Sequence, residues 1–390
     1  MTDVPKNTLI YHHRTQAVDA QGIHIHEMCR AFRELGWNVE MVALVSDEAV
    51  GKVSRQGEAY DLLAKIPPFL YEILEIGYNF VGFWRLYRRA KRTKPSFIYE
   101  RYSLFNFAGI LVSVLTGIPL MEEINAPLVY EKKKYDHLFF VALARFIEKS
   151  IINFSHKTIV VTSSLRNMLL REGARRDKMI VMHNGVNRHD FFSNASPFEG
   201  KANPSKPSKG RFCTIGFVGW FRDWHGLAEV IRSMKDRNWG EKGVRLLLVG
   251  DGPSRPDLEN EIHENGVESY VAITGEASRG QVLSHLAEID IALQPAATSY
   301  ACPMKLIEYM ASGKAIVAPC QENIRELIAH EMNGLLFKPG DWKDFSGQVE
   351  RLINDGEMIR RLGREARRTV INRGFTWKEN ARRVLDLFAR

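Results

Sequence analysis

Residues 300–313 read Tyr-Ala-Cys-Pro-Met-Lys-Leu-Ile-Glu-Tyr-Met-Ala-Ser-Gly and follow the short apolar run 289–293. That run predicts a buried strand, and the apolar spacing from Met304 to Ser312, closed by a glycine, predicts a helix. Such a helix begins at the turn, where its unpaired N–H groups and the positive end of its dipole favour an anion. The stretch therefore predicts the strand, turn and helix of an α/β domain, with an anion site at the turn.

Two side chains in this stretch suit a nucleotide. Lys305, in the first turn of the predicted helix, adds a full positive charge suited to a phosphate. Glu308 lies one turn further on, and its carboxylate can accept two hydroxyl hydrogen bonds, as from a ribose. The alternative is an ordinary exposed ion pair between the two residues at helix spacing.

The rest of the chain alternates strands and helices in two series. In the first half, the predicted helix 23–35 separates the first two of the strands 8–13, 38–44, 96–99, 119–124, 158–161 and 178–182. In the second half, the predicted strands are 214–219, 245–249, 271–274, 289–293 and 315–318, with helices 227–234, 258–265, 281–287, 304–312 and 323–329. This alternation predicts parallel sheets covered on both faces. We therefore predict an α/β fold of two doubly wound, Rossmann-like domains that face each other across a ligand-binding cleft.

A change in composition marks the domain boundary. Residues 193–210 carry three prolines among serines, lysines and glycines, which is typical of an exposed linker. We predict an N-terminal domain over 1–192, a linker over 193–210 and a C-terminal domain over 211–375. The remaining segment, 376–390, opens with the capping-box pattern Thr-Trp-Lys-Glu, and we expect it to form a helix that packs back on the first domain.

Length and composition indicate an enzyme-sized protein of a reducing cytoplasm. At 390 residues the chain is longer than a typical single domain. Its four cysteines are scattered without metal or disulfide spacing, and the amino terminus lacks a secretory signal. The uncharged run 102–121 approaches the length of a membrane span, but Gly117 and Pro119 interrupt it. It is better interpreted as a buried helix ending at Gly117, followed by a strand.

The net charge of +8 is concentrated in one segment. Residues 85–94 hold six basic side chains and no acid, and Phe80, Phe83, Trp84 and Tyr87 share one stripe of the same predicted helix. A helix with one aromatic and one basic face suits an anionic membrane surface. We therefore expect residues 80–94 to bind peripherally to the inner face of a membrane. The alternative is that the aromatic stripe packs on the domain's own sheet while the basic face is solvated. No motif for nucleic acid binding accompanies the segment, so no such partner is expected.

The order of motifs along the chain resembles that of the retaining glycosyltransferases of family four, which have the GT-B fold. The second half carries them at 216–219, 249–253, 274–275, 302–313, 333–341 and 375–377. The first half adds Gly22, 163–166, 178–182, 184–187 and Phe191. The resemblance covers essentially the whole chain, and the ordered set is far more specific than any one motif.

The resemblance implies transfer of a sugar from a nucleotide-diphosphate donor to a carbohydrate or lipid-linked acceptor, as in polysaccharide, glycolipid or other glycoconjugate synthesis. Lys305, Arg222 and the start of the helix at Met304 are the implied groups for the leaving diphosphate, and Glu308 the group for the ribose. Asn125 stands where the family often offers a histidine to the donor sugar. The other implied donor-binding residues are Gly22, Gly219, His225, Gly252, Thr274, Gly275, Ala301, Cys302 and Pro303. No Asp-x-Asp sequence occurs in the chain, so we predict transfer without a metal ion or cofactor.

Two departures from the family pattern bear on the donor sugar. Tyr300 stands where the family often has the first glutamate of a Glu-x7-Glu pair, so backbone groups of Ala301 and Cys302 are the expected substitutes. The usual Arg and Lys pair after the first strand of the second domain is also altered, because Trp220 follows Gly219. Arg222 is the candidate replacement.

Other functions and roles stay open from the sequence. A nucleotide-sugar epimerase on the same fold and a catalytically silent nucleotide-sugar-binding protein are the main alternatives. A nicotinamide dehydrogenase is more remote, since 250–252 lacks the full glycine fingerprint. Cys302 is interpreted as a packing residue rather than a nucleophile. Glu122 and Glu123 resemble an acid/base pair, but neighbouring strand residues point to opposite faces. The histidines near the amino terminus suggest a metal, although a structural or donor-loop role fits them better: His12, His13, His24 and His26.

Overall fold

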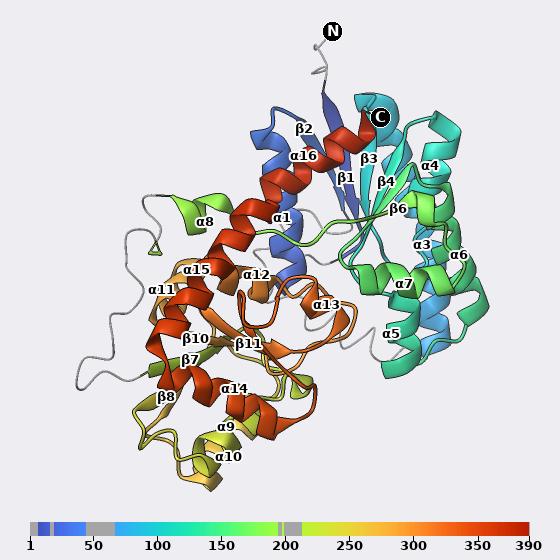
Figure 1. Ribbon diagram of the computed structural model, residues 1–390. Coiled ribbons are helices and arrows are strands. Elements are labelled where there is room, and N and C mark those ends of the chain that lie inside the picture. The colour runs from blue at the N-terminus through green and yellow to red at the C-terminus, as the bar shows by residue number, and fades with distance from the viewer. Residues whose placement is uncertain (1–6, 16–18, 44–66, 194–196, 199–212, 390) are drawn as a thin grey trace. The chain divides into compact units, whose positions relative to one another are not determined.

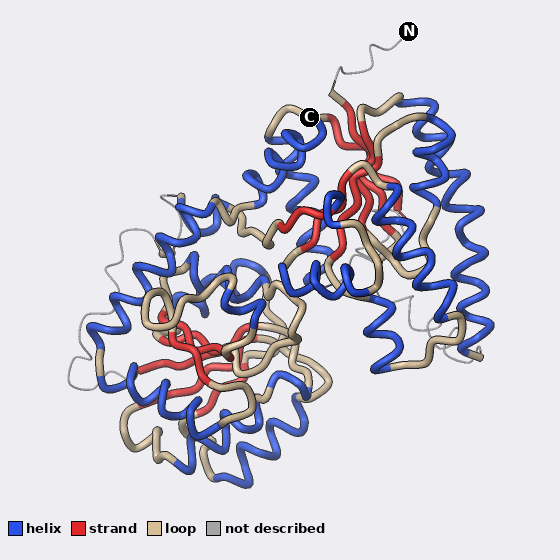
Figure 2. Tube along the Cα trace, turned by 45° about the vertical axis from the view of Figure 1, so that its right-hand side comes forward, coloured by secondary structure: helices blue, strands red, loops and turns tan. Residues whose placement is uncertain are grey.

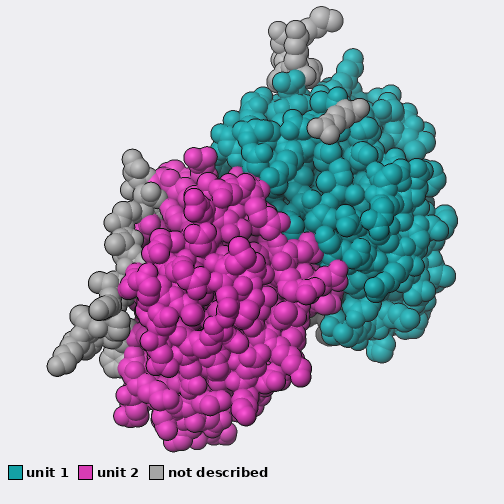
Figure 3. Space-filling model, viewed as in Figure 1, with its two compact units in different colours: residues 1–183, 377–390 teal, residues 184–376 magenta. Residues whose placement is uncertain are grey.

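The computed structural model describes residues 7–15, 19–43, 67–193, 197–198 and 213–389 (Figure 1). The chain divides into two compact units, coloured separately in Figure 3. Unit 1 comprises Met1–His183 and Trp377–Arg390, and unit 2 comprises Asn184–Thr376. In both units, strands are enclosed by helices (Figure 2). Most of the predicted linker 193–210 lies outside the described residues.

The boundary predicted at residue 192 is wrong, because the segment after His183 packs with unit 2. Helix α8, Arg188–Phe192, buries Phe191 completely, and Arg367 donates a hydrogen bond of 2.9 Å to the carbonyl oxygen of Phe191. Asp190 accepts a hydrogen bond of 3.0 Å from the guanidinium of Arg279. These contacts attach 184–192 to the second unit, whereas the change in composition that suggested the boundary begins only after them.

The first unit is built on a parallel six-stranded sheet. Its strands are β1 Thr8–His13, β2 Asn38–Ala43, β3 Phe97–Arg101, β4 Leu120–Ile124, β5 Lys157–Val160 and β6 Met179–Val181. Their order across the sheet is β2-β1-β3-β4-β5-β6, and every pair is parallel. The predicted strands are therefore confirmed. Strands β1, β3 and β4 are buried along their whole length, as expected for the inner strands of a parallel sheet covered on both faces.

Helices cover both faces of this sheet. They are α1 Asp19–Glu34, α3 Pro68–Thr93, α4 Ala108–Thr116, α5 Leu128–Tyr135, α6 Val141–Phe154, α7 Ser163–Arg171 and α16 Trp377–Phe388, with the short turn η3 Arg176–Lys178. Figure 1 shows α1 and α16 on one side of the sheet and α4 and α6 on the other. The last helix packs within unit 1, where the ring of Phe388 lies 4.9 Å from that of Phe97 and Trp377 lies 4.6 Å from His24.

The second unit repeats the architecture. Its strands are β7 Cys213–Val218, β8 Val244–Val249, β9 Val271–Ile273, β10 Ile291–Leu293, β11 Ala315–Pro319 and β12 Leu335–Phe337. They form a second parallel sheet in the order β12-β11-β10-β7-β8-β9. The other elements are η4 Asp223–His225, α9 Leu227–Asp236, α10 Arg255–Asn265, α11 Arg279–Glu288, α12 Met304–Ala311, α13 Glu322–Arg325, α14 Trp342–Asn354 and α15 Gly356–Arg373. The fold class predicted from the sequence, α/β with two doubly wound sheets, is confirmed.

The uncharged run 102–121 forms a short helix and a strand. Helix α4 ends at Gly117, which adopts the left-handed conformation with φ of +73°, and β4 follows. The prediction that this helix is buried is wrong for its outer face, where Val114 and Leu115 are exposed. None of the helices in the described ranges is both long and apolar enough to cross a bilayer.

Candidate active site

The strand order of unit 2 brings four loops to one edge of its sheet. Strands β10, β7, β8 and β9 are consecutive neighbours and all parallel, so the loops after them leave from the same edge. Those loops hold the predicted donor-binding residues of this unit. Gly219, Arg222 and His225 follow β7, Gly252 follows β8, Thr274 and Gly275 follow β9, and the segment from Ala301 to Glu308 follows β10.

Glycines let these loops approach one another closely. Gly219 has φ of +147°, and a Cβ there would lie 2.6 Å from Nζ of Lys305. Gly252 has φ of +153°, and its Cβ would lie 2.3 Å from the carbonyl oxygen of Phe221. A side chain at either position would meet both backbone strain and a clash. The glycines therefore fix the shape of the surface beside Lys305.

Thr274 ties the β9 loop to the β8 loop. Its hydroxyl accepts a hydrogen bond of 3.1 Å from the N–H of Gly250, and it donates one of 2.9 Å to the carbonyl oxygen of Gly275. Gly250 and Gly275 also pair as an isolated bridge. Thr274 and Gly275 thus hold the loop framework together, and their direct contact with the donor stays a prediction.

Lys305 is the central charged group of this edge. Its ammonium lies 3.8 Å from the centre of the Phe217 ring, and no carboxylate of the described residues lies within ion-pair distance of it. Burial lowers the pKa of Lys305 to about 7, and the negative charge of Glu308 only partly opposes this effect. This environment favours binding of an anion, because a negative charge next to the ammonium raises the pKa of Lys305 and stabilises its protonated form.

His225 lies beside this lysine as a neutral group. Its ring packs 5.0 Å from that of Phe217, and its Nδ1 accepts a hydrogen bond of 3.2 Å from the N–H of Arg222. Burial, followed by the positive charges of Lys305 and Arg222, lowers the pKa of His225 to about 3. A neutral imidazole whose Nδ1 accepts carries its proton on Nε2, so His225 can donate one hydrogen bond. The exposed guanidinium of Arg222 lies 5.7 Å from the ring of Trp224.

Glu308 is paired, but not with Lys305. One of its oxygens accepts a hydrogen bond of 2.7 Å from a terminal nitrogen of Arg279. The Nε of Arg279 donates a second hydrogen bond, of 3.0 Å, to Asp190. The interpretation of Lys305 and Glu308 as an ordinary surface ion pair is therefore wrong. Arg279 was missed by sequence reasoning, because it opens α11 and no spacing connects it with α12. The second oxygen of the Glu308 carboxylate can still accept a hydrogen bond from a hydroxyl group.

The turn before α12 is held from two sides. The carbonyl oxygen of Ala301 accepts a hydrogen bond of 2.7 Å from Asn323, and that of Cys302 accepts one of 2.8 Å from Asn184. Burial raises the pKa of the Cys302 thiol to about 12, so this cysteine is no nucleophile near neutral pH. Tyr300, which stands where the family often has a glutamate, is buried as well. Pro303 directly precedes Met304, the first residue of α12.

Gly22 and Asn125 belong to unit 1. Gly22 is buried in the first turn of α1, so it lies inside a helix and not in a loop after β1. Asn125 follows β4, and its side-chain amide donates a hydrogen bond of 2.9 Å to Glu123. This bond fixes the orientation of the Asn125 side chain.

Glu123 is the centre of a buried polar network. It lies 2.6 Å from Nε2 of His24 and accepts a hydrogen bond of 2.9 Å from the Tyr99 hydroxyl. Burial acts to raise the pKa of Glu123, but His24, Arg101 and Asn125 outweigh it and hold the pKa at about 2. Glu123 is therefore an anion that positions its neighbours.

Glu122 lies on the other face of the sheet, opposite Glu100 in the strand register. Burial and the charges of Glu100 and Glu123 raise the pKa of Glu122 well above its usual value. Of the four histidines near the amino terminus, His12 lies 2.7 Å from Glu100 and His24 lies 2.6 Å from Glu123. These pairings account for both side chains without a metal ion.

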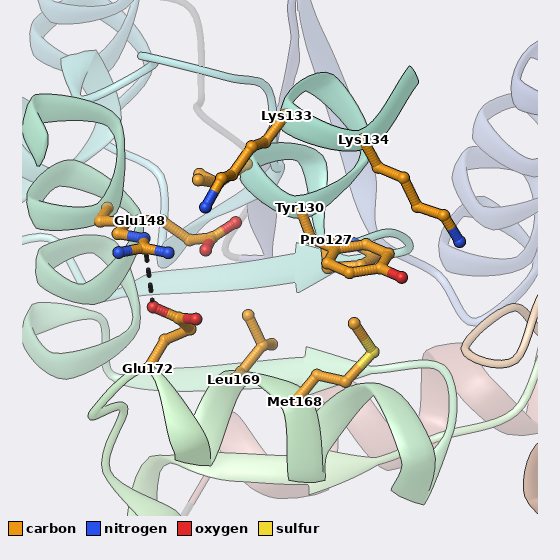
Figure 4. Close-up of a pocket in the computed structure, with 10 residues that line it drawn as sticks. Pro127, Tyr130, Lys133, Lys134, Glu148, Met168, Leu169 and Glu172 are labelled. Carbon is orange, nitrogen blue, oxygen red and sulfur yellow. Dashed lines mark ion pairs between the residues drawn. The ribbon is translucent and has the colours of Figure 1, made fainter. Parts of the chain in front are cut away.

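Unit 1 also contains an open pocket of about 290 Å³ next to the segment that follows β4 (Figure 4). Its apolar side includes Met168 and Leu169 of α7, and Lys133 and Lys134 extend from α5 (Figure 4). The remaining lining residues are Pro127, Val129, Tyr130, Arg145, Glu148 and Glu172. Burial raises the pKa of Glu148 to about 7, so this carboxyl is partly protonated near neutral pH. Apolar, cationic and neutral polar groups together suit a sugar or a small anionic head group.

Two family models match the chain. The model of glycosyl transferases group 1 matches residues 201–369, and that of glycosyltransferase family 4 matches residues 21–190. Together they span both units. The chain belongs to the group 1, family 4 glycosyltransferases.

Several curated relatives are similar to this glycosyltransferase. An uncharacterized glycosyltransferase of Methanocaldococcus jannaschii is 26% identical over 60% of each chain. The N,N'-diacetylbacillosaminyl-diphospho-undecaprenol alpha-1,3-N-acetylgalactosaminyltransferase of Campylobacter jejuni is 25% identical over 79% of this chain and 81% of its own length. The sulfoquinovosyl transferase of Arabidopsis thaliana is 23% identical over 73% of this chain, which corresponds to 54% of that protein.

Solved structures share the fold over nearly the full length. HepE of Anabaena, in complex with UDP, superposes with a TM-score of 0.73 at 16% identity and covers 98% of this chain and 99% of that one. Sucrose-phosphate synthase from Thermosynechococcus elongatus gives a TM-score of 0.71 at 16% identity, with 98% of both chains covered. These likenesses establish the fold as GT-B.

Proposed function

We propose that this glycosyltransferase moves a sugar from a nucleotide-diphosphate donor to a hydroxyl of a carbohydrate or lipid-linked acceptor. The transfer retains the anomeric configuration, requires neither a metal ion nor a cofactor, and serves the synthesis of a polysaccharide, glycolipid or other glycoconjugate. We place the enzyme in the cytoplasm, because its scattered cysteines fit a reducing compartment. We also place it peripherally at the inner face of a membrane. Its named relative from Campylobacter acts on a lipid-diphosphate acceptor, and HepE binds UDP, which agrees with these classes of substrate.

The observation that carries the proposal is the half-buried Lys305 with its low pKa, without an ion-pair partner among the described residues and at the start of α12. Departure of a nucleoside diphosphate leaves negative charge on the β-phosphate, and fixed cations stabilise that charge most strongly where water is excluded. Arg222 and the N–H groups at the start of α12 add to this stabilisation. The second carboxylate oxygen of Glu308 accepts a hydrogen bond from a ribose hydroxyl.

The described residues of unit 2 favour transfer without a protein nucleophile. Cys302 is held as a thiol by its raised pKa, and Glu308 is bound by Arg279. The acceptor oxygen would attack the anomeric carbon from the face that the diphosphate leaves, so the configuration would be retained. The bond between that carbon and the β-phosphate oxygen would break as the glycosidic bond forms, and an oxygen of the departing phosphate would take the proton of the acceptor hydroxyl. We assign the acceptor to the pocket of unit 1 beside Lys133 and Glu148.

The reaction class can be tested by nuclear magnetic resonance of the product. Incubation with a nucleotide sugar and an acceptor is expected to give a glycoside with the anomeric configuration of the donor, at a rate unchanged by a metal chelator. An inverted anomer or inhibition by the chelator would contradict the proposal. Conversion of the donor sugar without an acceptor would instead indicate an epimerase, and binding without turnover a silent protein.

The low pKa of Lys305 makes donor binding dependent on pH. A bound diphosphate favours the protonated ammonium and raises the pKa of Lys305 above its free value of about 7. Affinity for a nucleotide sugar is therefore greatest below pH 7 and falls by up to about tenfold for each pH unit above it, until the pKa of the complex is reached. Calorimetric titration over roughly pH 6 to 9 measures this profile. The Lys305→Arg variant stays charged throughout and is expected to give a flat profile, whereas a flat wild-type profile would refute the role of Lys305.

A further inference from the structure

The outer side of helix α3 exposes large apolar side chains. Phe80 is 79% exposed and Trp84 is 51% exposed. The helix packs inward through Gly82, Leu86 and Ala90. Other exposed apolar side chains of the same helix are Phe69, Leu70, Ile73, Leu74 and Val81. The alternative in which the aromatic stripe packs on the sheet is therefore wrong for Phe80 and Trp84.

Neighbouring helices extend this apolar surface. Helix α4 packs on α3 where Gly82 approaches Ala108, and its outer residue Val114 is 72% exposed. The ring of Phe139 lies 6.2 Å from that of Phe69, which connects the start of α6 with the start of α3. We call the exposed apolar residues of α3 together with the following ones the docking face: Leu111, Val114, Leu115, Phe139, Leu143, Phe146 and Phe154. Figure 1 shows α3, α4 and α6 on the same side of unit 1.

Charge is distributed unequally around the docking face. The first acid of α3, Glu72, turns inward: it is buried and accepts hydrogen bonds from the backbone N–H groups of Phe139 and Phe140 at 2.8 and 2.9 Å. Between Glu75 and Glu100 the sequence contains no acid. The outward-facing residues near the end of α3 are basic instead: Arg85, Arg88, Lys91, Arg92 and Lys94.

Aromatic and basic side chains are interleaved on the last turns of α3. The guanidinium of Arg88 lies 5.2 Å from the centre of the Trp84 ring, and the ammonium of Lys91 lies 5.6 Å from that of Tyr87. Trp84 and Tyr87 stack at 5.8 Å. An aromatic ring next to an exposed cation suits the boundary between lipid head groups and acyl chains, where the ring is buried and the cation meets a phosphate.

We propose that the docking face binds directly to an anionic bilayer through all three helices α3, α4 and α6, with Phe80, Trp84 and Val114 inserted among the lipids. This extends the contact expected for 80–94 alone to a surface three helices wide, and it deepens the proposed peripheral location. A bilayer is favoured over a protein partner by charge complementarity, because the face presents apolar side chains and cations, Glu72 is buried, and no acid occurs between Glu75 and Glu100.

Cosedimentation with vesicles tests the proposal. The full-length protein is expected to bind vesicles of phosphatidylcholine and phosphatidylglycerol, to bind pure phosphatidylcholine weakly, and to dissociate as salt is raised. The double variant Phe80→Ser/Trp84→Ser is expected to bind roughly tenfold or more weakly, because it loses two inserted rings. The matched control Met332→Ser/Ile371→Ser, at exposed positions of unit 2, is expected to bind like the wild type.

Three results would overturn the proposal: equal binding to both vesicle compositions, no binding, or unchanged binding of the double variant. Size-exclusion chromatography at several concentrations detects the competing case, in which the face joins two copies of the chain and Phe80→Ser/Trp84→Ser dissociates them. Thermal midpoints confirm that the variants fold. Nucleoside diphosphate binding measured on the same samples separates a failure of the docking face from a failure of the proposed transfer, since no residue of the donor site is altered.

Discussion

Lys305→Ala is expected to lower kcat/KM for sugar transfer by about two to three orders of magnitude, comparable with the loss of a preorganised charge-stabilising donor. The side chain has no ion-pair partner among the described residues, and it lies at the start of α12 beside Gly219. Its removal therefore takes away charge stabilisation of the leaving diphosphate while the loops stay in place. Steady-state kinetics with a nucleotide sugar and an acceptor measure the effect.

The chain offers a matched control for this substitution. Lys343 is the second residue of α14, as Lys305 is the second residue of α12, and it is exposed in the same unit. Lys343→Ala is expected to leave the kinetics unchanged. Near-normal turnover in Lys305→Ala, or equal losses in both variants, would show that the ammonium of Lys305 does not meet the leaving group.

Glu123→Ala is expected to destabilise unit 1 by about 3 to 5 kcal/mol, the range for removing one partner from a buried ion pair. The carboxylate forms a buried ion pair with Arg101 at 3.7 Å and also binds His24, Tyr99 and Asn125. Its loss leaves the buried Arg101 without its counter-charge and the buried His24 and Tyr99 without their acceptor. Urea unfolding followed by circular dichroism measures the loss of stability. Asn125 also loses the bond that orients it, so transfer is expected to weaken in the fraction that remains folded.

A glutamate of the same sheet provides the comparison. Glu40 on β2 pairs with Arg89 at 2.6 Å, and both side chains are partly exposed to solvent. Glu40→Ala is expected to cost no more than about 1 kcal/mol, as for a surface ion pair. If Glu123→Ala is no more destabilising than Glu40→Ala, the buried network does not support unit 1 as described.

Much of the fold was predictable because both sheets are parallel and buried. Strands covered on two faces are short apolar runs, and helices between them end at glycines such as Gly117 and Gly313. Strand β12, residues 335–337, was missed because glycine, proline and aspartate surround it within the motif 333–341, and these residues are typical of a turn or loop.

The site residues that belong to sequence motifs could be predicted, whereas those whose position depends on tertiary packing could not. Lys305 and Glu308 could be identified from their place in the helix after β10. The bonds of Arg279 to Glu308 and of Asn184 to Cys302 could not, since they join distant parts of the chain. Periodicity also placed Trp84 on an aromatic stripe of α3, but only the packing of that helix decided that Trp84 faces solvent.

We expect the Lys305 site to bind the diphosphate of a nucleotide. Calorimetric titration of the wild type and of Lys305→Ala with uridine, guanosine and adenosine diphosphates tests it most directly. We expect the wild type to bind at least one of the three, and Lys305→Ala to bind the same nucleotide at least about tenfold more weakly because it loses one charge-assisted contact. Failure of the wild type to bind any of them, or equal affinities of the two proteins, would contradict the claim.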